Sequence, residues 1–258
     1  MVTFYNQAVL LIFVICLPWN ESMTYDWYDL LLNLLFGLGD TLGKSALMIA
    51  LSLISAGDVS AISLNKPIPA SIIACILLGE SFDVFDGVLV VINCVGLVLI
   101  AESANGISKD SSNVYGVLCA FVALASFVFI YFVARVLARK GKANPSLLSF
   151  MAGWIGVALS SVYLALTNAW HFPGKLDDVL MFLGLGCSTI IHFYSLTKAL
   201  LTENMMFVAS GMSVTIPITY IYDALFTQHK LAWQNIVGAL LTVSSTLLLF
   251  TKTSCKEE

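Results

Sequence analysis

Apolar runs close to twenty residues long recur along the whole chain, and they constrain the fold more than any other feature. The hydrocarbon core of a bilayer is about 30 Å thick, and an α-helix of roughly 20 apolar residues crosses it. In lipid, backbone groups must be paired within helices or a closed barrel, and barrel strands alternate in hydropathy over about 10 residues. The continuous runs therefore predict an all-α membrane protein, with the lipid bilayer as its solvent.

The composition supports this interpretation. Charged residues make up 11% of the 258 residues and apolar residues 59%, whereas a soluble domain carries about 25% charged residues. The chain has no basic cluster with interleaved aromatic residues, so we expect no nucleic-acid partner. Its six cysteines form no CxxC pair and its three histidines lie in separate segments. Without a catalytic motif either, the sequence predicts no metal, no cofactor and no enzymatic activity.

The runs predict about nine transmembrane helices, four before and five after a polar linker at Glu102–Asn113. The first run has no Lys or Arg before it, which favours a short spanning helix over a signal peptide. The nine predicted spans are Thr3–Pro18, Asp29–Ile54, Asp58–Leu78, Phe85–Ala101, Val114–Ala138, Ser146–Thr167, Asp178–Leu200, Met206–Phe226 and Trp233–Thr251.

Basic residues in short loops predict the orientation, because Lys and Arg are retained on the cytoplasmic side. Four of them cluster around the loop after the fifth span: Arg135, Arg139, Lys140 and Lys142. That loop should be cytoplasmic. Alternation of the spans then places the C-terminus in the cytoplasm and Met1 outside or in a lumen. The sequon at Asn20 would then face the cytoplasm and stay unglycosylated. The sequence does not separate the plasma membrane from the endomembranes (ER or Golgi).

An internal repeat relates the two parts of the chain. Gly37-Leu-Gly39 recurs as Gly184-Leu-Gly186, and an offset of about 149 residues pairs Phe85–Ala101 with Gln234–Phe250. Pro67 and Pro217 fall within one residue of each other at this offset. The predicted organisation is a first repeat at 1–101, the linker at 102–113, a second repeat at 114–251 and a cytoplasmic tail at 252–258. Inverted repeats are typical of secondary transporters.

The stretch Gly57–Ala101 resembles the end of an EamA-type repeat. Pro67 within a helix, the Gly79-Glu80 loop and Gly96 in the final helix carry the resemblance, and Gly37–Leu51 resembles the helix before them. The second repeat departs from the pattern at His229 and at the displaced Pro217. Over nearly the whole chain the sequence resembles subgroup G of solute carrier family 35, in the drug/metabolite transporter superfamily.

The resemblance implies ten helices in two inverted five-helix repeats, both termini cytoplasmic, and transport by alternating access. On this pattern the first helix of the first repeat is missing from the chain. A truncated gene model, a splice form or a degenerate copy would each account for it. Because that helix normally lines the central cavity, the alternative to a transporter is a non-transporting membrane protein of the same fold, such as an inactive paralogue or a regulatory subunit.

Lys66 is the leading candidate for substrate binding. It lies eight residues into its predicted span, between Asn65 and Pro67, with Pro69 close by. A charge at a helix centre costs roughly 2.5–3.5 kcal/mol on insertion scales, so it usually faces a cavity or a partner. The two prolines remove backbone donors and break the helix. We expect Lys66 and Asn65 to bind the anionic part of a small-molecule substrate. The alternative is a structural ion pair of Lys66 with Asp40.

The other candidate substrate-binding residues are Asp40, Lys44, His192, Tyr194 and Tyr220. Asp40 and Lys44 are four residues apart, so they either form a local ion pair or line the cavity. His192 could carry a coupling proton, with Tyr194 near it, or could be a packing residue. Pro217 is the predicted helix break of the second repeat. A transporter of a small anionic metabolite, with a homodimer left open, is the function that the sequence favours.

Overall fold

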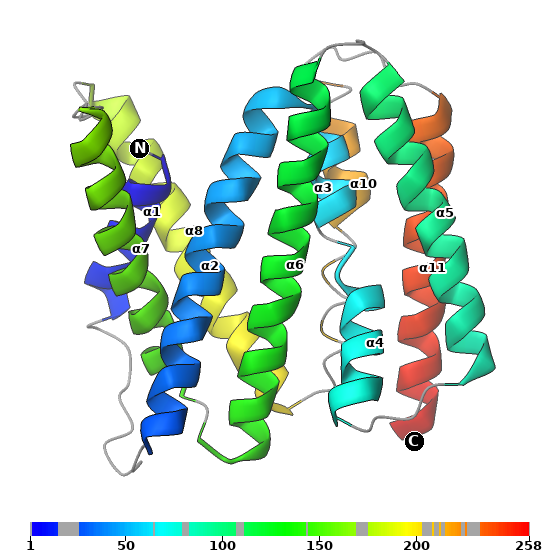
Figure 1. Ribbon diagram of the computed structural model, residues 1–258, viewed down its shortest axis with the longest axis horizontal. Helices are drawn as coiled ribbons and strands as arrows, with labels where there is room; N and C mark the ends of the chain where they lie inside the picture. Colours follow the sequence, from blue (N-terminus) through cyan, green and yellow to red (C-terminus); the bar gives the residue numbers. More distant parts are fainter. Residues whose placement is uncertain are drawn as a thin grey trace. The chain divides into compact units, whose positions relative to one another are not determined.

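The structure is a computed structural model, and it describes residues 2–14, 26–63, 65–78, 83–106, 111–142, 144–168, 175–202, 208, 212, 215–222, 225 and 233–257. All the elements in these ranges are helices, which confirms the predicted all-α fold (Figure 1). They are α1 (Val2–Val14), α2 (Trp27–Leu53), α3 (Ala56–Ser63), α4 (Pro67–Leu78), α5 (Val84–Gly106), α6 (Ser111–Arg139), α7 (Pro145–Thr167), α8 (Leu176–Thr202), α10 (Thr215–Tyr222) and α11 (Trp233–Glu257).

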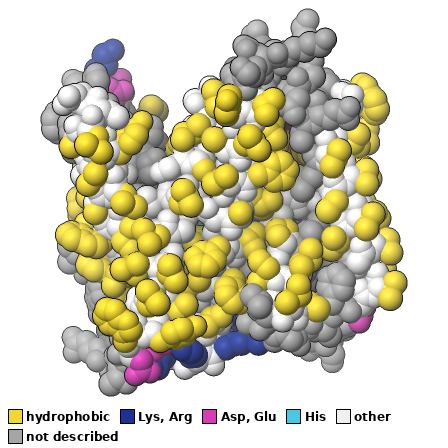
Figure 2. Space-filling view, viewed as in Figure 1, with side chains coloured by type: hydrophobic (Ala, Val, Ile, Leu, Met, Phe, Trp, Pro, Cys, Tyr) yellow, Lys and Arg dark blue, Asp and Glu magenta, His cyan; other side chains and the backbone are white. Residues whose placement is uncertain are grey.

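Within the described residues, four helices are long and apolar enough to cross a bilayer. These spans are Trp27–Leu53, Val114–Arg139, Pro145–Thr167 and Leu176–Ala199, and shorter apolar stretches lie at Gly87–Ile100 and Ile236–Ser245. Hydrophobic side chains cover most of the face seen in Figure 2, and the acidic and basic ones gather at its upper and lower margins. This distribution matches a membrane protein, whereas the count of nine spans stays a prediction.

The structure differs from the prediction at two places. The expected single span Asp58–Leu78 is two shorter helices, α3 and α4, with Asn65 and Lys66 between them. The expected linker Glu102–Asn113 is largely helical, since α5 runs to Gly106 and α6 begins at Ser111. Polar residues can extend a helix beyond the bilayer, where water satisfies their side chains, so hydropathy places these helix ends too early.

The chain divides into two compact units, and the division falls within α2 and α6. The first unit comprises residues 1–44 and 129–202. In it, α1 packs against α7 and α8. Glycines allow the close approach: a Cβ at Gly156 would lie 2.6 Å from Cγ of Gln7, and a Cβ at Gly37 would lie 2.7 Å from the carbonyl oxygen of Met151. The Gly37-Leu-Gly39 motif is therefore a helix-packing motif, as small residues in membrane helices often are.

The second unit comprises residues 45–128 and 203–258. Here α5 packs along α11, and α3 packs against α10 and α5. A buried apolar cluster that includes Val59, Ile62, Ile100 and Ile216 joins these helices. The α5–α11 pair joins the two segments that the 149-residue offset relates, as a twofold arrangement of repeats predicts. The repeat itself stays a prediction.

Candidate functional site

The break between α3 and α4 has a local chemical cause. A proline has no N–H, so Pro67 and Pro69 cannot donate to the carbonyls of Ser63 and Asn65. Both prolines lie in the first turn of α4, where a missing N–H costs little. The backbone of Lys66 already belongs to the new helix, since its carbonyl accepts from the Ala70 N–H at 2.9 Å. The prolines therefore begin a helix here, rather than interrupting the middle of one.

Lys66 is buried at this break, with 4% of its side chain exposed. Its Nζ lies 4.4 Å from the ring centroid of Phe127 on α6, which is cation–π distance. A buried ammonium on the face of an aromatic ring is attracted by the electrons of that ring. The charge is thus held inside the second unit between the end of α3 and the start of α4, and its role in substrate binding stays a prediction.

Asn65 belongs to a hydrogen-bond network that the sequence analysis missed. Its Nδ2 donates to Oδ1 of Asn93 on α5, and Nδ2 of Asn93 donates to Oγ of Ser245 on α11 at 3.0 Å. All three side chains are at most 1% exposed. The network ties the α3–α4 break to both partners of the α5–α11 pair. Asn93 and Ser245 are polar residues in apolar runs, and that was the signal available to find them.

Tyr220, a predicted site residue, lies on α10 in the same unit. Its hydroxyl donates to Oδ1 of Asp58 on α3 at 3.1 Å, and both side chains are buried. Ser55 caps α3 through its Oγ, which accepts from the Asp58 N–H at 3.1 Å. The sequence analysis treated Asp58 only as a span boundary. Pro217 lies in the first turn of the same helix, α10.

The predicted ion pair between Asp40 and Lys44 forms in the first unit. Nζ of Lys44 lies 2.8 Å from Oδ2 of Asp40, and Asp40 is 1% exposed. Gln7 of α1 donates its Nε2 to the same carboxylate oxygen at 3.0 Å. Lys44 also lies 4.7 Å from the ring centroid of Phe193 on α8. The carboxylate therefore joins α2 to α1, and Lys44 carries the contact on to α8. Lys66 belongs to the other unit, and its suggested pairing with Asp40 stays a prediction.

His192 and Tyr194 both lie on α8 in the first unit. The side chain of His192 is exposed and that of Tyr194 is half-buried. Phe193 between them is 3% exposed and packs edge-on against Phe36 of α2. The two predicted residues thus flank the buried face of α8. Their roles in substrate binding stay predictions.

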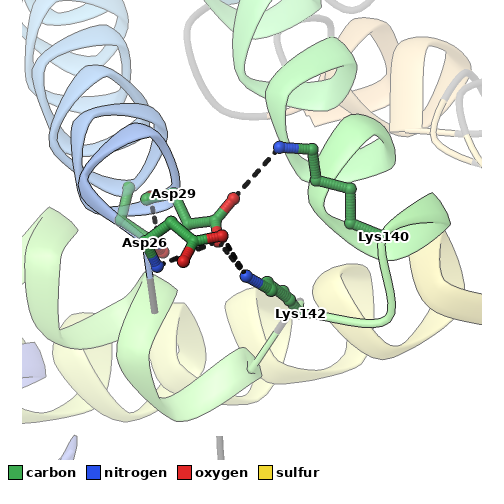
Figure 3. Close-up of polar contacts among 5 residues, drawn as sticks. Asp26, Asp29, Lys140 and Lys142 are labelled. Carbon is green, nitrogen blue, oxygen red and sulfur yellow. Dashed lines mark hydrogen bonds and ion pairs between the residues drawn. The ribbon is translucent and has the colours of Figure 1, made fainter. Parts of the chain in front are cut away.

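An ion-pair cluster joins the start of α2 to the turn after α6 (Figure 3). Nζ of Lys142 lies 2.6 Å from Oδ2 of Asp29 and 2.8 Å from Oδ2 of Asp26, and Nζ of Lys140 lies 3.1 Å from Oδ1 of Asp29. The hydrogen bond to Asp26, then the one to Asp29, raises the pKa of Lys142 above its ordinary value. The start of α2 and this basic turn therefore lie at the same end of the first unit, as the predicted alternation of spans requires.

Local backbone geometry positions that cluster. Gly141 ends α6 with a φ of 65°, and the N–H of Lys142 donates to the Leu137 carbonyl at 3.0 Å. This left-handed C-terminal turn directs the chain back along the helix end. At the other side, the backbone N–H of Asp26 donates to Oδ2 of Asp29 at 3.2 Å, which is half of a capping box. The sequence alone shows neither the bond from the Lys142 N–H to the Leu137 carbonyl nor the bond from the Asp26 N–H to Asp29.

Known proteins match this chain both in sequence and in structure. Residues 1–101 match the EamA-like transporter family. Solute carrier family 35 member G1 from Homo sapiens is 26% identical over 220 residues, covering 81% of this chain and 60% of the relative. The Mus musculus protein of the same name is 24% identical over 216 residues, covering 79% and 58%. The chain thus spans about 60% of the length of these curated relatives.

A solved structure, titled only as the crystal structure of a protein, shares the fold. Its TM-score is 0.68 at 15% identity, and the match covers 98% of this chain and 86% of that one. The resemblance to EamA-type proteins and to solute carrier family 35 subgroup G is confirmed by the sequence matches. The structural match supports the helical fold independently of them.

Proposed function

We propose that this chain, an integral membrane protein related to the EamA-like transporters, moves a small anionic metabolite across a membrane by alternating access. Lys66 binds the anionic part of the substrate. The observation that carries the proposal is the ammonium of Lys66, 4% exposed at the α3–α4 break. Transporters commonly place a substrate site at a broken helix near the bilayer midplane.

Physical cost supports a functional charge at this position. Burying an ammonium in a membrane helix is unfavourable by roughly 2.5–3.5 kcal/mol on insertion scales, and a neutral residue of similar length would avoid that cost. Phe127 offers its ring face to the ammonium, with Nζ 4.4 Å from the ring centroid. An arriving anion would meet a positive charge that is already desolvated, and electrostatic attraction is stronger in such surroundings.

In this proposal, Asp40 and Lys44 of the first unit tune the charge along the transport path. His192 carries a coupling proton, because histidine in water titrates near neutral pH. We place the C-terminus and the Lys140–Lys142 turn in the cytoplasm, from the basic residues of that turn. The membrane itself is the plasma membrane or an endomembrane of the ER or Golgi.

Uptake into proteoliposomes tests the proposal. The full chain is reconstituted, and uptake is screened with labelled organic and phosphorylated anions. Lys66→Met should abolish saturable uptake, because it keeps the side-chain length and removes the charge. Lys198→Met is the matched control, since Lys198 is an exposed lysine on α8. Unchanged uptake in Lys66→Met would remove Lys66 from the site.

A further inference from the structure

The donors and acceptors in the hydrogen-bond network of Asn65, Asn93 and Ser245 can be assigned by starting from Ser245 on α11. Oγ of Ser245 donates to the Thr242 carbonyl at 2.9 Å, so the single hydroxyl hydrogen is already used. Ser245 must therefore accept from Asn93, which donates through Nδ2 at 3.0 Å. The same Nδ2 lies 3.4 Å from the Thr242 carbonyl oxygen, which can only accept. The amide of Asn93 thus has one permitted orientation.

That orientation fixes Asn65 as well. With Nδ2 of Asn93 turned to α11, its Oδ1 faces Asn65 and can only accept, so Asn65 donates through Nδ2. Oδ1 of Asn65 is then the free end of the amide. It is buried, and it has no hydrogen-bond donor among the residues that the structure describes. A buried acceptor without a donor costs free energy, so such atoms in folded proteins usually mark a bound water, ion or ligand.

We propose that Oδ1 of Asn65 accepts a hydrogen bond from the transported substrate, and that Asn93 is the positioning residue that holds it in place. The inference rests on the proposed function, since it takes Lys66 as the site of the anionic group. Asn65 and Lys66 are consecutive in the chain, and both are buried at the α3–α4 break. The substrate class is therefore an anion with a hydroxyl or amine close to its charged group.

The donors and acceptors of the site favour substrates that carry a hydroxyl or amine beside the anionic group. Lys66 supplies only donors, and any carboxylate or phosphate satisfies them. Asn65 presents only an acceptor, because its amide hydrogens are turned toward Asn93. A substrate lacking the donor would leave the buried oxygen unpaired, and sites of this kind discriminate strongly against such analogues. Lys66 would give affinity for anions in general, and Asn65 would select among them.

Paired anions that differ by one hydroxyl test the inference on the reconstituted full chain. The probes are lactate against propionate, and 2-hydroxyethyl phosphate against ethyl phosphate. Binding is measured by the shift in melting temperature and by competition with any anion that the uptake screen identifies. In at least one pair the hydroxylated member should bind tenfold or more tightly. Asn65→Leu should remove this preference while leaving anion binding that still depends on Lys66.

A second variant guards against misfolding of Asn65→Leu. Ser245→Ala removes the hydroxyl that accepts from Asn93 Nδ2 and adds no charge, so it should weaken the preference without abolishing anion binding. Ser244→Ala is the control on α11, because Ser244 is exposed and its Oγ donates to the Leu241 carbonyl of its own helix.

The outcomes separate this inference from the proposed function. If both members of every pair bind equally, and Lys66→Met abolishes both, the role of Asn65 is wrong and that of Lys66 stands. A water molecule on Oδ1 of Asn65 would give that result. If no probe and no screened anion binds, the anion site at Lys66 is wrong, and the inference falls with it.

Discussion

Two lysines in this chain have different surroundings: Lys44 lies within α2 with 14% of its side chain exposed, whereas Lys66 is buried at the α3–α4 break. Lys44 has a carboxylate 2.8 Å away on its own helix, and that carboxylate also accepts from Gln7. Lys66 lies against an aromatic ring at the junction of two helices. An ion pair that is buried together tolerates the loss of neither member, because the remaining charge is left uncompensated. If Lys66 binds the substrate, as proposed, its charge should matter more to uptake than to folding.

Replacing Lys66 should therefore separate stability from function. Lys66→Met is expected to abolish uptake and to leave the melting temperature unchanged or higher, since a desolvated charge is removed and a Met side chain fills the same space. Thermal unfolding in detergent measures the second quantity. A large fall in melting temperature would instead indicate that Lys66 is a member of a structural ion pair.

Replacing Lys44 should have the opposite effect on stability. Lys44→Met removes the cation beside the buried Asp40 carboxylate, which keeps its hydrogen bond from Gln7, and it should destabilise the fold by roughly 3 kcal/mol. The double variant Asp40→Asn with Lys44→Met removes both charges and should recover most of that loss. If the single and double variants melted alike, the Asp40–Lys44 pair would not be the cause.

At the scale of elements, close helix contacts depend on particular glycines. A Cβ on Gly96 would lie 2.8 Å from the carbonyl oxygen of Gly238, and one on Gly238 would lie 2.7 Å from that of Gly96. The clash is with backbone on both sides, which cannot rotate away as a side chain can. The α5–α11 pair is therefore closer than side chains would permit, and the Asn93–Ser245 bond spans the same pair.

Gly96→Val should consequently push α5 away from α11. We expect a destabilisation of about 1–3 kcal/mol, the range for overpacked sites, together with weaker substrate selection through the displaced Asn93. Gly184→Ala on α8 is the control, because a Cβ there meets nothing within 4 Å. Equal melting temperatures for the two variants would mean that the glycine contact contributes little.

The contact between the α2 start and the α6–α7 turn is electrostatic, and it should respond to charge and pH accordingly. Lys142→Ala should lower the melting temperature, and Asp26→Lys with Lys142→Asp should restore part of it. Because contacts with Asp26 and Asp29 raise the pKa of Lys142, its contribution should be complete below pH 10.5 and lost at higher pH. A difference between wild type and Lys142→Ala that persists unchanged well above pH 10.5 would contradict the ion pair.

For the molecule as a whole, the sequence predicted the helices whose bounds follow from the length of an apolar run. The long helices α2, α6, α7 and α8 lie close to their predicted bounds. It predicted a break near Pro67 but placed that proline inside a helix, because the apolar residues on both sides of Asn65 and Lys66 together have the length of one span. It could not identify the partners of Asn65, Asp29 or Tyr220. Those contacts join residues far apart in the chain, and only the packing of helices brings them together.

Orientation in the membrane is a further property of the whole molecule. We expect a membrane-impermeant maleimide to label Lys109→Cys in intact cells, and the native Cys255 only after permeabilisation, in a background without the other cysteines. Both expectations follow from a cytoplasmic Lys140–Lys142 turn and alternating spans. Labelling of Cys255 in intact cells would reverse the orientation.

Counterflow in proteoliposomes tests the central claim, transport of an anion bound at Lys66, most directly. Vesicles are loaded with an excess of the unlabelled anion, and entry of the labelled anion is followed with and without that load. For the wild-type chain, the load should accelerate entry several-fold, because a carrier returns faster when occupied. Lys66→Met should give no acceleration. Entry that ignores the internal load, or acceleration that survives in Lys66→Met, would contradict the account.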